Sequence, residues 1–394
     1  MTSQACPTGR VLPRRESGAG AWLAERSQGP MPAGAVLVHA PSGAFQAPGG
    51  GENQLVQTAR HLEARGIPVR PFSPWTDRLE RARLLHLFGM TREGLELARV
   101  ARARGVPVVL SPICWFEPRA LVALASSPAR AAWDLAKWGV RAAVPRTPGW
   151  RRALLGLADA ILPNSKAEAR QLVRLFGASR RAIRVVPNGV DERFARADPG
   201  AFRAEFGRDD FVLFVGRIEP RKNVQGLIRG LSGRGMPLVV IGDAVPGHEA
   251  YADECRRDGR GFVRWLPRLE HDDPLLASAY AAARVVALPS WFETPGLVAL
   301  EAAMAGRAVV ITPFGCTREY FGDAVRYARP DRPGAIGRAV ERAWQDGPDP
   351  GLAARIGAHC LWPEVARRTA EAYDRVPRTG GERSRNSPPT ATDQ

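Results

Sequence analysis

The sequence predicts an α/β protein with two doubly wound parallel sheets. Short apolar runs alternate with segments of helical period, a pattern typical of parallel sheets that helices cover on both faces. The alternation occurs twice, first in residues 34–200 and again in residues 201–360. With 394 residues and 45% hydrophobic content, the chain is long enough for two domains with separate cores.

The two ends of the chain differ from the rest in composition. Residues 1–33 are rich in Gly, Pro, Ser and Arg without any period, and residues 377–394 are polar, so we expect a disordered leader and a disordered tail. No run is long enough to span a membrane, and the first residues lack the apolar core of a signal peptide. The five cysteines form no CxxC pair, which indicates neither a disulfide framework nor a zinc site. We therefore expect a cytoplasmic protein.

The formal net charge is +16, which three kinds of partner would explain. Nucleic acid is disfavoured, because the basic residues are dispersed rather than gathered in one stripe with interleaved aromatics. An anionic membrane surface and phosphate-bearing substrates explain the charge equally well. Only three of the cationic residues are lysines, namely Lys137, Lys166 and Lys222, so each stands out against a background of arginine.

The first half begins with a strand and a glycine-rich loop. The strand at 35–40 leads to Gly49, Gly50 and Gly51, and a helix follows from Glu52. Such loops let the backbone approach a phosphate or a sugar, but this one lacks a GxGxxG or Walker pattern and is a weak signal alone. Further strands are expected at 67–72, 84–88, 106–113 and 158–163.

Aromatic residues in this half have competing interpretations. His86 lies inside an apolar strand, where a core histidine with a satisfied hydrogen bond is more common than a ligand. Residues 117–158 are largely helical and carry Trp133, Trp138 and Trp150. An amphipathic face there would suit a membrane or an acceptor, but we expect these tryptophans to pack in the interior.

Two local motifs lead out of the first half. Ser165 and Glu168 match a capping box for the next helix. The turn at 187–191 contains Gly189, where we expect a positive φ. We place the domain boundary near residue 200.

The second half carries two candidate cations for binding an anion. A strand at 211–215 ends in Gly216 and Arg217, and Lys222 precedes the next helix. At the carboxyl end of a strand and the N-terminus of a helix, charge and backbone dipole would both hold a diphosphate. Two solvated surface cations are the alternative. Further strands are expected at 237–242, 262–266, 284–289 and 308–312.

The stretch 291–306 contains two glutamates, Glu293 and Glu301. Glu293 lies on the loop after a strand, and we expect Thr294 to cap, and Pro295 to begin, a helix that contains Glu301. A carboxylate at the carboxyl end of a parallel strand is a candidate for contacting substrate. A solvated loop glutamate and an exposed helix glutamate are the alternatives.

Five stretches, in this order along the chain, resemble the retaining glycosyltransferases of glycosyltransferase family 4, which have the GT-B fold. They are PNSKAEARQLVRLFG, VVPNGVDERF, FVLFVGRIEPRKN, LPSWFETPGLVALEAAMAGRAVV and GCTREYFGD. The resemblance is strong over about 160–330 and looser over 35–115. It implies two Rossmann-like domains facing across a cleft, the first for the acceptor and the second for the donor, with a helix at 361–376 crossing back to the first domain.

The resemblance also implies roles for individual residues. Glu293 matches the glutamate that contacts the donor sugar, and Glu301 the one that binds the nucleotide ribose. Arg217 and Lys222 match the basic pair on the diphosphate. Glu319 falls at a further acidic position to which we assign no role. The other donor-binding positions implied are Gly216, Thr294, Pro295, Gly296 and Leu297 in the second domain and Gly50 and Gly51 in the first.

The chain departs from the family pattern in two places. Many members carry a histidine beyond the strand where this chain reads Ser111–Trp115, and none is present there. In the Glu293–Gly296 loop, Thr294 stands where Phe or a similar residue commonly follows the glutamate. We therefore expect a differently shaped pocket and leave a catalytic role for the first of these regions open.

The resemblance implies transfer of a sugar from a nucleotide diphosphate sugar to an acceptor hydroxyl, in polysaccharide or other glycoconjugate synthesis. We expect a glycan or lipid-linked acceptor and no metal cofactor, since His271 and the neighbouring Asp272 and Asp273 have no acidic partner at suitable spacing. Peripheral contact with the inner face of an anionic membrane is a further possible interaction. The alternatives are a GT-B epimerase or phosphorylase, and a nucleotide-sugar-binding protein without turnover.

Overall fold

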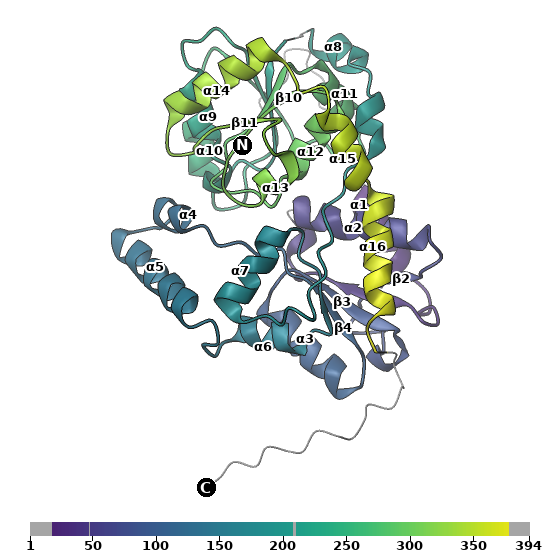
Figure 1. Cartoon of the computed structure of the whole chain (residues 1–394). Coiled ribbons are helices and arrows are strands. Elements are labelled where there is room, and N and C mark those ends of the chain that lie inside the picture. The colour runs from purple at the N-terminus through teal and green to yellow at the C-terminus, as the bar shows by residue number, and fades with distance from the viewer. Residues whose placement is uncertain (1–17, 47, 208–209, 378–394) are drawn as a thin grey trace.

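The protein is described here by a computed structural model that covers residues 18–46, 48–207 and 210–377. Two α/β domains lie one above the other in Figure 1, and each is built on one parallel sheet. The expected pair of doubly wound domains is confirmed. The parts of the expected leader and tail at 1–17 and 378–394 lie outside the described residues.

The first domain contains a five-stranded sheet in the order β2-β1-β3-β4-β5. Neighbouring side chains of β1 point to opposite faces, so Val36 and Val38 join one core cluster while Leu37 joins another on the other side of the sheet. Apolar layers on both faces are what the continuous apolar strands predict. The strands are β1 (Val36–His39), β2 (Val69–Pro71), β3 (Leu84–Phe88), β4 (Val108–Ser111) and β5 (Ala160–Ile161), and the helices after α1 are α2 (Gly50–Glu63), α3 (Arg92–Ala103), α4 (Pro118–Ala123), α5 (Pro128–Ala143), α6 (Trp150–Leu157) and α7 (Lys166–Phe176).

The second domain contains a six-stranded sheet in the order β11-β10-β9-β6-β7-β8. Every pairing in it is parallel. Its strands are β6 (Val212–Val215), β7 (Leu238–Ile241), β8 (Val263–Leu266), β9 (Val285–Leu288), β10 (Ala308–Ile311) and β11 (Arg326–Tyr327), and its helices are α8 (Gly200–Phe206), α9 (Val224–Leu231), α10 (Glu249–Asp258), α11 (Pro274–Ala282), α12 (Leu297–Met304), α13 (Thr317–Phe321), α14 (Pro333–Asp346) and α15 (Leu352–His359).

A short helix, α1 (Gly18–Ser27), lies inside the stretch expected to be a disordered leader. The Trp22 ring is only 4% exposed and belongs to the core of the first domain. The Glu63 carboxylate accepts hydrogen bonds from Trp22 Nε1 over 3.1 Å and from Arg26 Nε over 2.7 Å. The prediction was wrong for this segment. Contacts with the rest of the domain hold this short helix in place, and its sequence is too short to show a helical period.

The domain boundary lies before the predicted position near residue 200. Val190 and Phe194 already belong to the core of the second domain. Val190 forms a parallel bridge with Leu361, and the Phe194 ring meets Tyr280 edge-on. The loop therefore enters the second domain earlier than its polar composition suggests.

The last helix, α16 (Trp362–Asp374), crosses back and packs against α2. Figure 1 shows it running alongside the first domain. Trp362 and Tyr373 are each about 1% exposed and belong to the core of that domain.

Gly189 does not have the positive φ expected for it. A Cβ there would lie 2.3 Å from the Trp362 ring, so close packing is what requires the glycine.

Helix α5 differs from the prediction that its tryptophans pack inside. It packs mainly against α4 and α7, and one of its faces stays exposed, with Trp133 58% and Val140 55% exposed. Trp138 and Trp150 are half-buried and pack against the first-domain core. The helical period located the apolar residues correctly but could not show which layer would cover them.

His86 is a core residue, as the apolar run around it predicts. Its Nδ1 lies 2.7 Å from Tyr373 Oη on α16, and its Nε2 lies 2.9 Å from Ser111 Oγ on β4. Complete burial lowers the pKa of His86 from 6.5 to about 3. The imidazole therefore stays neutral while it connects the final helix to the first sheet.

This burial predicts a loss of stability in mild acid. Below pH 6.5 His86 is protonated in the unfolded chain but stays neutral in the folded chain. The free energy of unfolding therefore falls as the pH drops. Between pH 6.5 and pH 5 the contribution is about 2 kcal/mol. Thermal melts at pH 7.5 and pH 5 should show a larger drop for the natural protein than for His86→Gln. Equal drops in the two proteins would show that His86 is not held neutral.

Candidate active site

An ion pair between Lys222 and Glu293 lies at the centre of the candidate site. Lys222 Nζ donates to Glu293 Oε1 over 2.6 Å, and the Ser290 hydroxyl donates to the same oxygen over 2.6 Å. The side chains of Lys222 and Glu293 are only 15% and 6% exposed. Lys222 comes from the turn after β6 and Glu293 from the loop after β9, so the carboxyl ends of two adjacent strands meet here.

The two charges change each other's acidity. Burial alone would raise the pKa of Glu293, but Lys222, Arg221 and the Ser290 hydroxyl outweigh it and lower that pKa below its ordinary value. Burial lowers the pKa of Lys222, and Glu293 offsets part of that change. A depressed carboxyl pKa keeps Glu293 ionised at neutral pH, so the site presents a carboxylate beside an amine.

The backbone around Glu293 leaves no room for a side chain at Gly315. The two residues form a parallel bridge, in which Glu293 N donates to Phe314 O and Cys316 N donates to Glu293 O. Gly315 has a φ of +100°, and a Cβ there would lie 1.9 Å from Glu293 O. Both the conformation and the space require glycine, which fixes the loop that carries the carboxylate.

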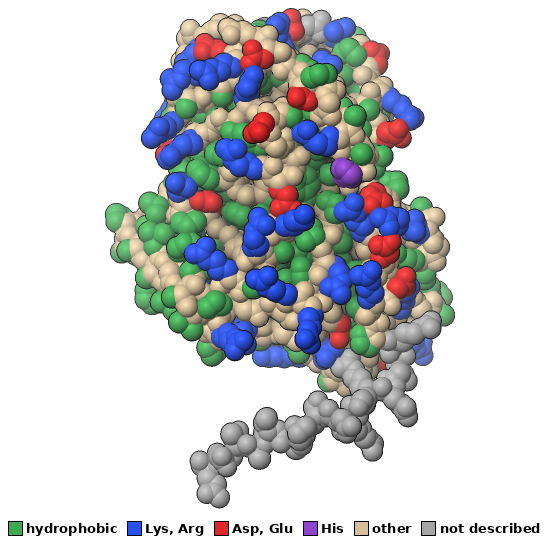
Figure 2. All heavy atoms as spheres, viewed as in Figure 1, with side chains coloured by type: hydrophobic (Ala, Val, Ile, Leu, Met, Phe, Trp, Pro, Cys, Tyr) green, Lys and Arg blue, Asp and Glu red, His purple; other side chains and the backbone are tan. Residues whose placement is uncertain are grey.

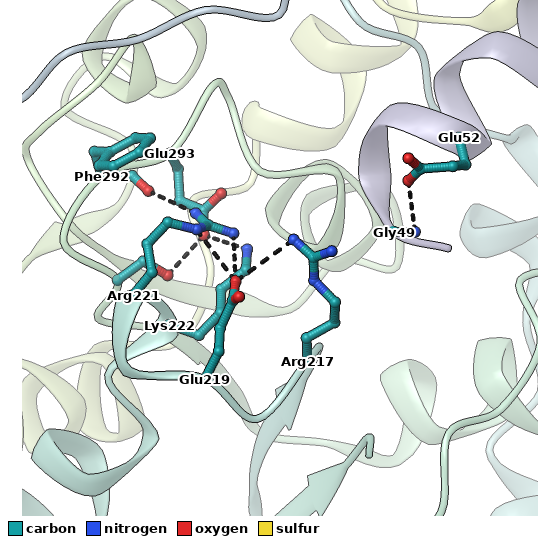
Figure 3. Close-up of polar contacts among 9 residues, drawn as sticks. Gly49, Glu52, Arg217, Glu219, Arg221, Lys222, Phe292 and Glu293 are labelled. Atoms are coloured by element: carbon teal, nitrogen blue, oxygen red, sulfur yellow. Dashed lines mark hydrogen bonds and ion pairs between the residues drawn. The ribbon is translucent and has the colours of Figure 1, made fainter. Parts of the chain in front are cut away.

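A second group of charges lies beside the pair, as Figure 3 shows. Glu219 Oε1 accepts from Arg221 over 2.9 Å and lies 3.5 Å from the Arg217 guanidinium. Arg221 also lies within 3.5 Å of Phe292 O. The Arg217 side chain is 38% exposed, so it is free to meet a ligand, whereas Arg221 is held on the protein.

The glycine loop of the first domain closes over this group from the other side. A Cβ on Gly49 would lie 3.5 Å from the Arg217 guanidinium, and a Cβ on Gly50 would lie 3.6 Å from Leu297 Cδ1. Figure 3 shows Arg217 pointing toward the end of α2 that carries Gly49. Gly51 instead faces Ile113 within the first domain. The structure therefore brings the predicted glycine loop and the predicted cations together at the domain interface.

The loop at 294–296 follows a different course from the predicted one. Helix α12 begins at Leu297, so Thr294 is not its cap and Pro295 is not its first residue. Thr294 O instead accepts a hydrogen bond of 3.1 Å from Asn164 Nδ2 of the first domain. Gly296 has a φ of +92° and lies against Glu293, since a Cβ there would be 3.4 Å from its carboxylate. The positive φ at Gly296 ends the loop and lets the helix start two residues late.

Glu301 lies apart from the Lys222–Glu293 contacts. It is 5% exposed, with Tyr280 Oη donating to Oε2 over 2.5 Å and His271 Nδ1 lying 3.4 Å from Oε1. It is neither a solvated helix residue nor a direct partner of the cations.

Gly216 directly follows β6 and has a φ of +146°. Its carbonyl oxygen would lie 2.0 Å from a Cβ on Gly242, so the two backbones approach closely here.

Two polar residues at this interface, Glu319 and Asn164, were not assigned roles from the sequence. Glu319 accepts the backbone N–H groups of Lys166 and Ala167, over 2.7 and 2.9 Å, and so caps α7 from the other domain. Glu168 accepts the N–H groups of Asn164 and Cys114, each over 2.7 Å.

The expected capping box is half present. Ser165 Oγ accepts from Glu168 N over 3.0 Å, but the Glu168 carboxylate reaches Asn164 and Cys114 instead of Ser165. Complete burial raises the pKa of Glu168 to about 7. The motif was therefore a usable signal for Glu168, whereas nothing local marks Asn164.

Neither a metal cluster nor a membrane span is found in the described residues. Within 18–46, 48–207 and 210–377, no three His, Cys, Asp or Glu side chains gather where they could hold a metal ion. In that same part of the chain, every helix is too short or too polar to cross a membrane.

Two family models match the chain, one on each domain. Residues 70–189 match the model described as "Glycosyl transferase 4-like domain", and residues 209–346 match "Glycosyl transferases group 1". Among curated relatives, the D-inositol 3-phosphate glycosyltransferase of Kribbella flavida is 40% identical over 179 residues, which are 40% of this chain and 41% of that protein. The one from Kineococcus radiotolerans is 32% identical over 254 residues, 56% of this chain and 58% of that protein. The match thus spans less than two thirds of these relatives.

Solved structures of similar fold cover most of the chain. Anabaena HepE in complex with UDP and glucose has a TM-score of 0.66 at 20% identity, over 86% of this chain and 99% of that one. Sucrose-phosphate synthase from Thermosynechococcus elongatus has a TM-score of 0.67 at 17% identity, over 86% of this chain and 98% of that one. At this identity the likeness establishes the fold.

Proposed function

This chain belongs to the group 1 glycosyltransferases with a glycosyltransferase 4-like first domain, and from that premise we propose that it moves a sugar from a nucleotide diphosphate sugar to an acceptor hydroxyl, with retention of configuration. The observation that supports this proposal best is the meeting of Lys222, Arg217 and Glu293 beside the glycine loop. That arrangement offers two cations and one carboxylate to a single ligand held between the domains.

The barrier to transfer lies in the departure of the diphosphate. Arg217 and Lys222 would stabilise the charge that develops on it, and the first turn of α12 would add backbone N–H groups that the helix cannot satisfy itself. A well-placed donor of this kind is worth about 3 kcal/mol in a transition state. We propose that these groups act without a dedicated metal ion.

Glu293 would contact the donor sugar near its reacting carbon. It is ionised next to Lys222, and positive charge develops at that carbon as the diphosphate leaves. When the diphosphate binds, Lys222 would divide its hydrogen bonds between the phosphate and the carboxylate. Glu301, held by Tyr280 and His271, would meet the ribose at the other end of the donor.

The acceptor would approach from the first domain. The curated relatives are named for D-inositol 3-phosphate, which supports a polyol or sugar acceptor. The proposal also includes a glycan or a lipid-linked acceptor.

Binding of a nucleotide sugar without turnover is the second candidate function, because the 111–115 loop has no histidine. The Cys114 thiol there is no substitute, since burial raises its pKa to about 12. Slow hydrolysis of one member of a nucleotide-sugar panel would exclude binding alone.

We also propose that an exposed apolar face on α4 and α5 contacts an anionic membrane surface. Figure 2 shows hydrophobic side chains gathering over the region where Figure 1 places these two helices. Lys137 Nζ lies 4.7 Å from the centre of the Trp133 ring, so a cation accompanies the apolar side chains. Such a combination suits the boundary between headgroups and acyl chains. The exposed apolar residues are Val122, Leu124, Trp133, Val140 and Val144.

Removing the Lys222 charge should abolish most turnover. Lys222→Gln keeps a polar partner for Glu293 but removes the cation, so we expect turnover to fall by about 10² to 10³. Circular dichroism should show an unchanged fold. The matched control is Lys166→Gln, whose exposed side chain lies outside the site and whose backbone N–H is the group bound by Glu319. Activity of Lys222→Gln within about twofold of the natural protein would refute the proposed role.

The membrane proposal has its own test. Cosedimentation with vesicles should require phosphatidylglycerol, and Trp133→Ser/Val140→Ser should weaken binding roughly tenfold or more, as loss of two buried apolar side chains implies. The control Trp75→Ser/Val100→Ser removes another exposed pair and should bind like the natural protein. Equal weakening by both double variants, or binding that ignores phosphatidylglycerol, would contradict the proposal.

A further inference from the structure

Asn164 belongs to the first domain, but most of its polar groups bond to the second domain. It lies between β5 and α7, at the carboxyl edge of the first sheet, and is only 3% exposed. Its Nδ2 donates to Thr294 O over 3.1 Å, and its Oδ1 lies 3.6 Å from Cys316 Sγ. Its backbone O accepts a hydrogen bond of 2.5 Å from Tyr320 Oη. Three of its four polar groups therefore contact the second domain.

The fourth polar group, the backbone N–H, is held by the first domain. Asn164 N donates to Glu168 Oε2 over 2.7 Å, and Glu168 is completely buried in the first turn of α7. The other oxygen of that carboxyl group accepts from Cys114 N over 2.7 Å. A polar network that is fully bonded makes its members rigid. The side-chain amide of Asn164 therefore extends from a fixed backbone toward Thr294.

Two of the contacts of Asn164 reach the segments that hold Glu293. Thr294 directly follows Glu293, and Cys316 N donates to Glu293 O over 3.0 Å. The amide thus bonds both to the loop of Glu293 and to the segment paired with that loop. Within the part of the chain that the structure describes, no backbone N–H donates to Thr294 O. The side chain of Asn164 is therefore what holds this carbonyl.

The residues on either side of Thr294 are held from within the second domain. Glu293 N donates to Phe314 O over 3.1 Å, and the carbonyl of Gly296 accepts from Ala299 N over 3.0 Å. A partly buried carbonyl that loses its partner disfavours its conformation by about tenfold or more. Without the amide, other conformations of the loop would become populated. Small misplacements of a catalytic group lower turnover strongly, so the position of this loop matters for the reaction.

We propose that Asn164 is a positioning residue, which holds the Glu293 loop in the conformation needed for sugar transfer. This inference rests on the proposed contact between Glu293 and the donor sugar. Asn164 acts through Thr294 and Cys316, so it needs no contact of its own with a substrate. On this account the first domain supports the chemistry at the donor as well as the binding of the acceptor.

The test compares Asn164→Ala with Gln171→Ala in the full chain. Asn164→Ala removes the amide but keeps the backbone groups that Glu168 and Tyr320 bind. Gln171→Ala is the matched control, because its amide also bonds to a backbone, at Phe116 N and O over 2.8 and 2.9 Å, but within the first domain. A third variant, Asn164→Asp, keeps the shape of the side chain and puts an oxygen where Nδ2 donates.

Hydrogen–deuterium exchange of the ligand-free protein tests the positioning without any substrate. We expect the backbone N–H groups of residues 291–297 to exchange about tenfold faster or more in Asn164→Ala and in Asn164→Asp. In Gln171→Ala they should exchange as in the natural protein. Natural exchange in Asn164→Asp would show that the donated hydrogen bond is not needed, and an equal increase in Gln171→Ala would indicate general loosening. Either result would overturn the inference.

Hydrolysis of UDP-glucose and of GDP-mannose separates positioning from donor binding. Because Arg217 and Lys222 are unchanged, Asn164→Ala should keep KM within about twofold while kcat falls about tenfold or more. A raised KM with an unchanged kcat would contradict the positioning role. Failure of the natural protein to hydrolyse either probe would count against the proposed transferase instead, and the exchange experiment would still decide the role of Asn164.

Discussion

The buried ion pair between Lys222 and Glu293 is the interaction on which the rest of the site depends. A buried charge pair is tolerated only when its geometry is tight and its remaining hydrogen bonds are satisfied. Ser290 supplies one such bond, and the backbone bridge to Gly315 fixes the loop that carries the carboxylate. Two adjacent parallel strands bring the partners together, so the sheet itself sets their separation. The site is therefore a property of the fold of the second domain.

The first domain completes the site through contacts made at one edge of its sheet. Gly50 packs on Leu297, Asn164 holds Thr294 O, and α7 is capped by Glu319 of the other domain. These contacts join the two domains near Glu293, while α16 connects them a second time by packing in the core of the first domain.

Much of this could be read from the sequence, but only where one local pattern decides the structure. Apolar runs located the strands, and the positions of Lys222 and Glu293 after strands placed them at one edge of a sheet. Patterns could not show that Glu301 would be enclosed by Tyr280 and His271, since that depends on packing between distant segments. The exposure of Trp133 could not be predicted for the same reason, because an amphipathic period does not show whether another layer covers the apolar face of the helix.

The most direct test of the account is a crystal structure of the protein with a nucleoside diphosphate bound. The account predicts that the terminal phosphate lies within about 3 Å of Lys222 Nζ and of the Arg217 guanidinium. It also predicts that the glycine loop at 49–51 lies over the ligand. A diphosphate bound elsewhere, out of contact with both Lys222 Nζ and the Arg217 guanidinium, would contradict it.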